Sequence, residues 1–340
     1  MTTTVTETAT DDGSTTLERL TRFLATQEGT AGTRIADLRR AGAGRSRENW
    51  LFDLVGPGPD DREPLILRSD PDGGLVDTSR AVEFAVLRAL EPSPLPTPRV
   101  RWLDATGGQL GSPSLLMRRE PGTCDYRVVN GDRPLPARRA LAETFCDLLA
   151  DVHATDWRGL GLTDVLTDPG EQAALHELDH WEQVLRHDQL EAHPELDLAI
   201  DWLRSRARPS RRTVLVHADF KPGNILLEGD RVSSLLDWEL AHLGDPLEDL
   251  GWVTQPLRAG EHLIEGSWTA ADLVARYTAA TGLEVEPDEL RWWVVFSTFK
   301  TAVMQVSGLR AFLEGRADEP YRPTRRVLST LLTAITGPRS

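Results

Sequence analysis

The sequence predicts an α+β chain of two unequal lobes, a small antiparallel sheet with one helix followed by a larger, mostly helical part. Short β-rich runs separated by turn residues dominate up to about residue 119, and apolar patterns with the 3.6-residue helical period dominate afterwards. Hydrophobic residues make up 40% of the 340 residues and charged residues 27%, which are ordinary values for globular domains. We therefore expect a frayed tail over 1–16, a first lobe over 17–119 and a second lobe over 120–340.

The first lobe is expected to contain an N-terminal helix, five short strands and one inserted helix. Apolar residues at helical spacing predict the first helix over 17–27. The runs RIADLRR, WLFDLV and PLILRSD, with turns between them, predict a three-stranded antiparallel meander. A helical period over 78–90, stopped by the proline-rich EPSPLPTP, predicts the inserted helix. The runs RVRWLD and SPSLLMRR flank a turn at Gly107–Gly108 and complete a five-stranded sheet.

Helical patterns cover most of the second lobe, and one β-rich patch interrupts them. The expected helices span 136–153, 170–207, 271–281, 287–307 and 323–336. The patch covers 213–237 and contains three short strands, TVLVH, NILLE and VSSLLD, with EGDR as a turn.

Composition narrows the classes of partner and of site. Acidic residues outnumber basic ones 53 to 38, and the formal charge of −15 repels nucleic-acid phosphates. Cys124 and Cys146 form no C-x-x-C pair, so no disulfide framework or cysteine metal site is indicated. The first sixteen residues do not resemble a signal peptide, and no apolar run approaches the roughly 18 residues that cross a bilayer. We expect a cytoplasmic protein with neither nucleic-acid nor membrane partners; the sequence leaves its oligomeric state open.

The segment VHADFKPGN, with DWE thirteen residues after its asparagine, supplies the groups that phosphoryl transfer requires. Asp219 and Asn224 have the spacing of the H-R-D-x-x-x-x-N loop of protein kinases, in which the aspartate accepts the proton of the attacking hydroxyl. The asparagine binds Mg²⁺, and a hairpin would return Asp237 to the same metal site. Lys221 either reaches the γ-phosphate or is simply solvated. His217 is expected to fix the loop by hydrogen bonding rather than to act as a base.

The segment LVHADFKPGNILLEGDRVSSLLDWELAHLGDPLEDLGWV resembles the aminoglycoside phosphotransferase family, whose members have the protein-kinase-like fold. Within the family it is most similar to the kinase-like domains attached to certain acyl-CoA dehydrogenases. Upstream, AGAGRSRENWLFDL is similar to the loop that covers ATP, LILRSD to the third strand, VEFAVLRAL to the first-lobe helix and LLMRREPG to the hinge. These matches cover most of residues 35–255. The resemblance implies ATP as phosphate donor, with GTP left open, and Mg²⁺ as cofactor.

The resemblance also implies a role for each matching residue. Asp219 is the catalytic base, Asn224 and Asp237 are the metal ligands, and Asp249 is the carboxylate that anchors the catalytic-loop backbone, unless it is only a charge at a helix N-terminus. The implied nucleotide-binding residues are Gly42, Gly44, Ser46, Arg68, Glu83, Met117 and Lys221. The two glycines form only a G-x-G, which is weak by itself. His153 ends a helix and is expected to pack or to cap.

Two positions depart from the family pattern. Arg68 stands where many members have the lysine that pairs with the helix carboxylate, here Glu83; its planar fork can hold both carboxylate and phosphate. Arginine is common at this position in the acyl-CoA dehydrogenase branch. Ala218 stands where the family usually has glycine, and alanine is tolerable there if its φ is negative.

These features predict an ATP-dependent phosphotransferase that acts on an alcohol group of a small molecule. The acceptor is either aminoglycoside-like, which the acidic charge favours, or a hydroxylated metabolite such as an acyl compound, which Arg68 favours. The alternative is a catalytically silent kinase-fold protein that binds a nucleotide or another ligand. A metal hydrolase built on His217 and Asp219 is disfavoured, because no second histidine follows at metal-site spacing.

Overall fold

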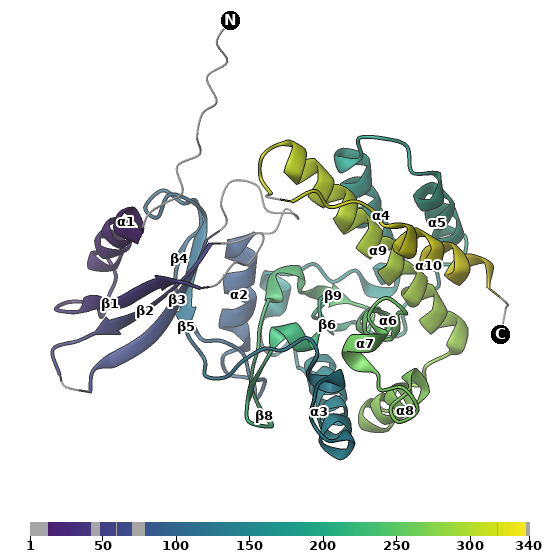
Figure 1. The fold of residues 1–340 in the computed structure, drawn as a ribbon, viewed down its shortest axis with the longest axis horizontal. Helices are drawn as coiled ribbons and strands as arrows, with labels where there is room; N and C mark the ends of the chain where they lie inside the picture. The colour runs from purple at the N-terminus through teal and green to yellow at the C-terminus, as the bar shows by residue number, and fades with distance from the viewer. Residues whose placement is uncertain (1–12, 42–47, 59, 70–78, 318, 338–340) are drawn as a thin grey trace, which may run out of the picture. The chain divides into compact units, whose positions relative to one another are not determined.

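The computed structural model of the protein describes residues 13–41, 48–58, 60–69, 79–317 and 319–337. Internal contacts divide the chain into two compact units, Met1–Asp72 with Val100–Arg119 and Gly73–Arg99 with Glu120–Ser340. In Figure 1, the strands β1 to β5 belong to the first unit, and the second unit runs on to the yellow helix α10. No helix within the described ranges is long and apolar enough to span a lipid bilayer.

The first unit is built on a five-stranded sheet, as predicted. Its strands lie in the order β1-β2-β3-β5-β4, and each is antiparallel to its neighbours. Helix α1 begins at Gly13, inside the expected tail of 1–16, because Thr16 continues the buried face that includes Phe23. That face packs with Phe52 of the sheet in one apolar core. The elements are α1 (Gly13–Ala25), β1 (Arg34–Arg40), β2 (Glu48–Val55), β3 (Arg62–Ser69), β4 (Val100–Asp104) and β5 (Ser114–Arg118).

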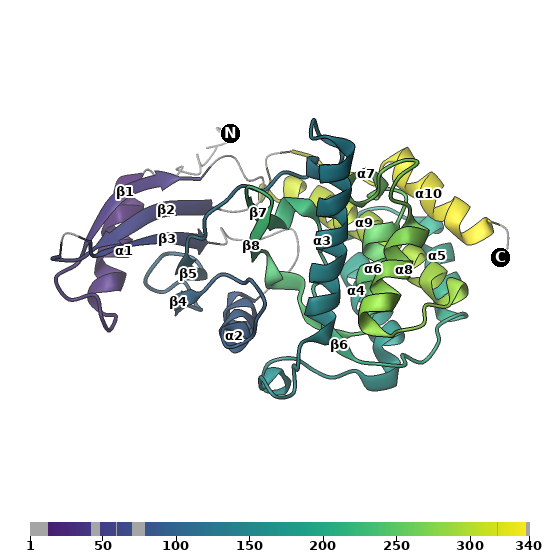
Figure 2. The ribbon, with the colours of Figure 1, turned by 90° about the horizontal axis from the view of Figure 1, so that it is seen from below.

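The second unit is mostly helical, and its short strands form two antiparallel pairs, β6 with β9 and β7 with β8. Its helices are α2 (Arg80–Leu90), α3 (Leu135–Ala154), α4 (Ala173–Asp188), α5 (Pro194–Arg204), α6 (Leu247–Thr254), α7 (Ala259–His262), α8 (Ala270–Thr281), α9 (Pro287–Leu313) and α10 (Arg325–Thr336). Its strands are β6 (Val214–Val216), β7 (Ile225–Glu228), β8 (Arg231–Leu235) and β9 (His242–Gly244). Helix α3 packs against β6 and α8, as can be followed in Figure 2.

One predicted helix of this unit was wrong in its extent. The single helix expected over 170–207 is a short 3₁₀ turn followed by α4 and α5. Helix α4 ends at Asp188, and α5 begins at Pro194, where the missing backbone N–H costs no hydrogen bond because it lies in the first turn of the helix. Helix α7 and strand β9, which are both short, were not predicted. Helix α6 corresponds to the helix that was expected to start at Asp249.

Helix α9 is the centre of the second unit. It packs against α4, α5, α6 and α10 (Figure 1), and its side chains are buried on several sides, including Trp292, Phe296 and Phe299. A helix that is apolar on more than one face is stable only when other elements cover it. This covering explains why α9 continues to Leu313, beyond the predicted end at residue 307.

Helix α2 belongs to the second unit by its contacts, although the sequence suggested a first lobe over 17–119 that included it. It packs against the 3₁₀ turn η5 (Trp238–Leu240), which follows the second motif. The segment after α2 is also tied there, because the Leu235 N–H donates to the Pro96 carbonyl at 2.6 Å.

Candidate functional site

The loop that carries Asp219 leaves the buried strand β6 through an unusual backbone turn. Val214 to Val216 are buried, and Ala218 follows with a φ of 65°. The condition under which alanine is easily tolerated at this position, a negative φ, is therefore not met. A non-glycine residue in the left-handed region costs roughly 1–2 kcal/mol, so the surrounding contacts must hold this turn.

Asp249 of α6 holds the backbone of the loop. Its side chain is fully buried, and its carboxylate accepts hydrogen bonds from the N–H groups of His217 at 2.8 Å and of Ala218 at 2.9 Å. Burial favours the neutral acid, but hydrogen bonds from His153 and from the His217 N–H outweigh it and lower the pKa of Asp249. Asp249 thus makes the contacts with the loop backbone that the resemblance implied.

His153 of α3 extends this anchor further into the core. Its Nε2 lies 3.1 Å from Oδ2 of Asp249, and its Nδ1 lies 2.5 Å from the hydroxyl of Tyr277 in α8. Burial raises the pKa of Tyr277, so the phenol keeps its proton for this hydrogen bond. The sequence suggested only packing or capping for His153, and no motif pointed to Tyr277.

His217 fixes the loop by hydrogen bonding, as expected. Its Nε2 lies 3.0 Å from the Leu236 carbonyl, and its Nδ1 lies 3.3 Å from the N–H of Asp219. Its ring also lies against Trp238, with centroids 4.8 Å apart. With both ring nitrogens engaged in holding the loop, His217 joins the first motif to the second.

The carboxylate of Asp219 has two side-chain partners. Lys221 Nζ lies 2.5 Å from its Oδ2, and Asn224 Nδ2 donates to the same oxygen at 3.1 Å. Asn224 Nδ2 also donates to the Asp219 carbonyl at 3.0 Å. Both bonds use the amide nitrogen, so the amide oxygen of Asn224 is the atom that a cation could bind.

A hairpin brings the second motif back to Asn224. Ile225 pairs with Leu235 in the β7–β8 register, and the Leu236 N–H donates to the Asn224 carbonyl at 2.7 Å. Asp237 is the next residue in the chain, and its backbone has a left-handed φ of 69°. The predicted return of the chain is therefore correct, and oxygen ligands of the kind that Mg²⁺ prefers are available from Asn224 and Asp237.

Two of the predicted nucleotide-binding residues, Arg68 and Met117, lie on the sheet of the first unit. Arg68 lies on β3, where it pairs with Asn49 and Leu115, and Met117 lies buried on β5. The predicted Gly42, Gly44 and Ser46 lie outside the described residues.

Glu83 has a partner that the sequence reading missed. Its carboxylate is buried on α2 and pairs with the guanidinium of Arg80, which also lies 3.7 Å from Glu239. Arg80 and Glu83 are three residues apart on one helix, and this spacing was the available signal. Pairing of Glu83 with Arg68 stays a prediction.

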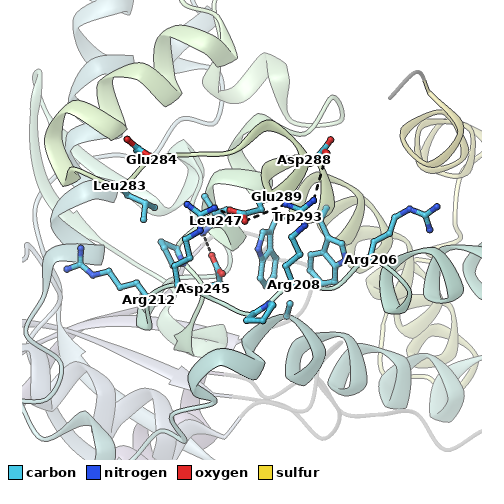
Figure 3. Close-up of a pocket in the computed structure, with 15 residues that line it drawn as sticks. Arg206, Arg208, Arg212, Asp245, Leu247, Leu283, Glu284, Asp288, Glu289 and Trp293 are labelled. Carbon is cyan, nitrogen blue, oxygen red and sulfur yellow. Dashed lines mark hydrogen bonds and ion pairs between the residues drawn. The ribbon is translucent and has the colours of Figure 1, made fainter. Parts of the chain in front are cut away.

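A small pocket in the second unit contains none of these residues. Figure 3 shows that arginines and acidic side chains line it together. Arg211 and Arg208 approach Glu289, at 3.0 and 3.8 Å, so the pocket holds its own counter-charges. Asp245, which follows the second motif by several residues, lies here, and burial raises its pKa.

Curated proteins are similar in sequence to most of this chain. The curated relatives include acyl-CoA dehydrogenase family member 10 of Mus musculus, which is 28% identical over 244 residues; the match covers 69% of this chain and 22% of that protein. They also include probable acyl-CoA dehydrogenase IBR3 of Arabidopsis thaliana, 28% identical over 313 residues, where the match covers 83% of this chain and 37% of that protein. The chain thus spans only a fraction of the length of these relatives.

A solved structure and a family model also match this chain. A putative aminoglycoside phosphotransferase from Ralstonia eutropha superposes with a TM-score of 0.67 at 22% identity, covering 94% of each chain, which shows that the fold is shared. The model of the phosphotransferase enzyme family matches residues 37–293, a range that contains both motifs and their anchor. The chain therefore belongs to the phosphotransferase enzyme family, with its kinase-like fold.

Proposed function

We propose that the protein transfers the γ-phosphoryl group of ATP to a hydroxyl group of a small molecule, with Asp219 as the catalytic base. The observation that carries this proposal is the position of Asp219. Its loop is held by Asp249 and lies beside the hairpin that brings Asn224 next to Asp237. Family membership supports phosphotransferase chemistry in general, and these contacts support the choice of Asp219 as its base.

The proposed role of Asp219 is to orient the acceptor hydroxyl and take its proton as the bond to phosphorus forms. Lys221 contacts one oxygen of the carboxylate, and we propose that it exchanges this contact for a phosphate oxygen when ATP binds. The Asn224 amide keeps the carboxylate oriented during that exchange.

Asn224 and Asp237 are the residues that would hold Mg²⁺. The ion would neutralise charge on the transferring phosphate. ATP as the donor is supported by a structurally similar protein, solved as a streptomycin–ATP–APH(2")-IIa complex. The free cysteines Cys124 and Cys146 are consistent with our proposal that the enzyme works in the reducing cytoplasm.

For the acceptor, we propose a hydroxylated acyl compound rather than an aminoglycoside. The support is the name of the curated relatives, which are acyl-CoA dehydrogenase family members. The solved structures named as aminoglycoside phosphotransferases share the fold at 22% identity or below, and a shared fold does not transfer an acceptor.

The test is a Mg²⁺-dependent ATP-consumption assay on the purified protein, with hydroxyacyl compounds, amino sugars and aminoglycosides as acceptors and ATP and GTP as donors. Asp219→Asn is the blank, because it keeps the shape of the side chain and removes the base. Turnover of a hydroxyacyl compound that is lost in the variant supports the proposal. Turnover of aminoglycosides alone would overturn the acceptor class. Nucleotide binding without turnover on any acceptor would favour a silent binding protein.

A further inference from the structure

A buried lysine that no motif contains reaches the backbone of the Asp219 loop. Lys300 lies in the middle of α9, and its side chain is 2% exposed. Its ammonium donates to the Ala218 carbonyl at 3.1 Å and lies 3.2 Å from Oε1 of Glu248. The rings of Trp181 and Trp252 lie 5.1 and 5.4 Å from the nitrogen. Removing an ammonium group from water costs several kcal/mol, so a protein keeps one in its core only with good partners.

Those partners form a chain of charges that continues into α4. The Oε2 of Glu248 lies 3.0 Å from Nε2 of His242, and the same nitrogen lies 3.6 Å from Glu177. The other ring nitrogen of His242 lies 2.9 Å from the Leu240 carbonyl. Since acceptors face both ring nitrogens, His242 is an imidazolium. Two glutamates are thereby matched by one imidazolium and one ammonium, and the cluster of Glu177, His242, Glu248 and Lys300 has no net charge.

The pKa values agree with this assignment. Burial by itself would lower the pKa of His242, but the charges of Glu177 and Glu248 outweigh burial and raise it to about 10. The pKa of Glu177 falls to about 2 because the charge of His242 and a hydrogen bond from His176 outweigh burial. His180 also faces the cluster, and burial lowers its pKa.

The same side chains could also be arranged around a metal ion, since Glu177, His242 and Glu248 offer ligand atoms within 4.8 Å of one another. The ammonium of Lys300 already lies beside Glu248 and would repel a metal ion bound to the same carboxylate. Binding would also require His242 to lose the proton that now bridges to Glu248. The charges therefore favour an ion-pair cluster over a metal site.

The cluster and the Asp249 anchor hold opposite sides of one turn. Glu248 and Asp249 are consecutive residues of α6: Asp249 accepts from the N–H of Ala218, and Glu248 holds the lysine that donates to the Ala218 carbonyl. Both polar groups of Ala218, which has a φ of 65°, are thus occupied by buried charged groups. The Ala218 carbonyl belongs to the peptide group that leads into Asp219.

We propose that Lys300 is a positioning residue for phosphoryl transfer, which holds the left-handed turn at Ala218 and thereby the direction of the Asp219 side chain. This proposal rests on the function proposed above, in which Asp219 is the base. The ammonium of Lys300 is buried against Glu248 and the Ala218 carbonyl, so we expect it to act through the loop rather than on a reactant. Its effect is expected on the chemical step more than on ATP binding.

The test compares Lys300→Met, which removes the charge at similar length, with Lys300→Arg, which keeps it. In the acceptor assay we expect Lys300→Met to lower kcat at least tenfold while KM for ATP changes less than threefold, and Lys300→Arg to recover part of kcat. Val306→Ala is the matched control, because it weakens the packing of the same helix at a buried site away from the loop. The control should keep kcat within about twofold. A Lys300→Met enzyme with the kcat of the control would overturn the proposal.

Hydrogen exchange gives a second readout that does not depend on an acceptor. The amides of His217, Ala218 and Asp219 should exchange at least tenfold faster in Lys300→Met and remain protected in Val306→Ala. If no acceptor is turned over, the proposed function fails, yet this measurement still decides whether Lys300 holds the turn. Unchanged protection in Lys300→Met would overturn the positioning role.

If Lys300→Met does not fold, Glu248→Gln tests the same link more gently, since it keeps the shape of the side chain and removes the one negative charge that Lys300 and His242 share. Faster exchange at residues 217–219 in Glu248→Gln would support the proposal, and wild-type exchange would count against it. Metal analysis of the purified protein should find no stoichiometric transition metal. A metal ion at Glu177, His242 and Glu248 would overturn the charge assignment.

Discussion

Replacing Asp249 by asparagine tests whether one buried carboxylate holds the catalytic turn. The side chain keeps its shape but loses its charge and one of its two acceptor oxygens. In the structure Oδ1 accepts from the Ala218 N–H, and Oδ2 accepts from the His217 N–H and lies 3.1 Å from His153. An asparagine has only one acceptor oxygen, so it can replace either Oδ1 or Oδ2 but not both. Its NH₂ group would then face a buried N–H, which is also a donor.

The expected loss of stability follows from these contacts. A hydrogen bond to a charged group contributes about 1.5–3 kcal/mol, and a buried donor left without an acceptor costs about 1–3 kcal/mol. We therefore expect Asp249→Asn to lower the free energy of unfolding by about 3–5 kcal/mol, a large share of the roughly 5–15 kcal/mol that stabilises a typical domain. Activity should fall as well, because the turn before Asp219 loses its anchor.

Equilibrium urea unfolding, followed by tryptophan fluorescence, measures this change. The matched control is Asp245→Asn, which alters another buried carboxylate close by that accepts only one backbone hydrogen bond, from the Leu247 N–H at 2.8 Å. The pKa of Asp249 is lowered in the folded state, so its stabilisation is present above the unfolded pKa of about 3.9 and is lost as the pH falls towards the lower folded value. Asp249→Asn should lack this part of the acid dependence. A loss below about 1 kcal/mol, or one equal to that of Asp245→Asn, would refute the reasoning.

Three further predictions concern the reaction and the charge cluster. Asp219→Asn should lower kcat about 10²–10⁴-fold with little change in KM for ATP, and steady-state kinetics that show equal losses in both would contradict the role of base. Asp237→Ala should raise the Mg²⁺ concentration needed for half-maximal nucleotide binding, and a wild-type Mg²⁺ titration would remove it from the metal ligands. Because the pKa of His242 is raised to about 10, its stabilisation is complete below its unfolded pKa of about 6.5 and is lost as the pH rises through about 10. Urea unfolding at pH 6, 8 and 10 should show this decline in the wild type and a weaker one in His242→Gln; parallel curves would argue against the imidazolium.

Local patterns in the sequence determined the sheet, most of the helices and the two motifs. The period-2 and 3.6-residue patterns arise within single elements, and the turn between β7 and β8 is itself local, so the return of the chain from Asn224 to Asp237 could be predicted. The break before Pro194 was also visible in the sequence, since proline cannot continue a helix from the preceding turn. The apolar period continues on both sides of this proline, which is why one helix was predicted where the structure has two.

Beyond the anchoring role of Asp249, which the resemblance implied, only the tertiary structure shows how the turn at Ala218 is held. Asp249 and Lys300 contact the loop, and His153 contacts Asp249; the three residues come from three different helices and lie far from the loop in the sequence. Alanine by itself disfavours a left-handed φ such as that of Ala218. Contacts from α6 and α9 stabilise this conformation. The sequence by itself thus predicted the residues that we propose for the chemistry, because their spacing within one segment is local. The packing of the helices decided which buried charges hold them, because charge partners in a core are chosen by proximity in space and not along the chain.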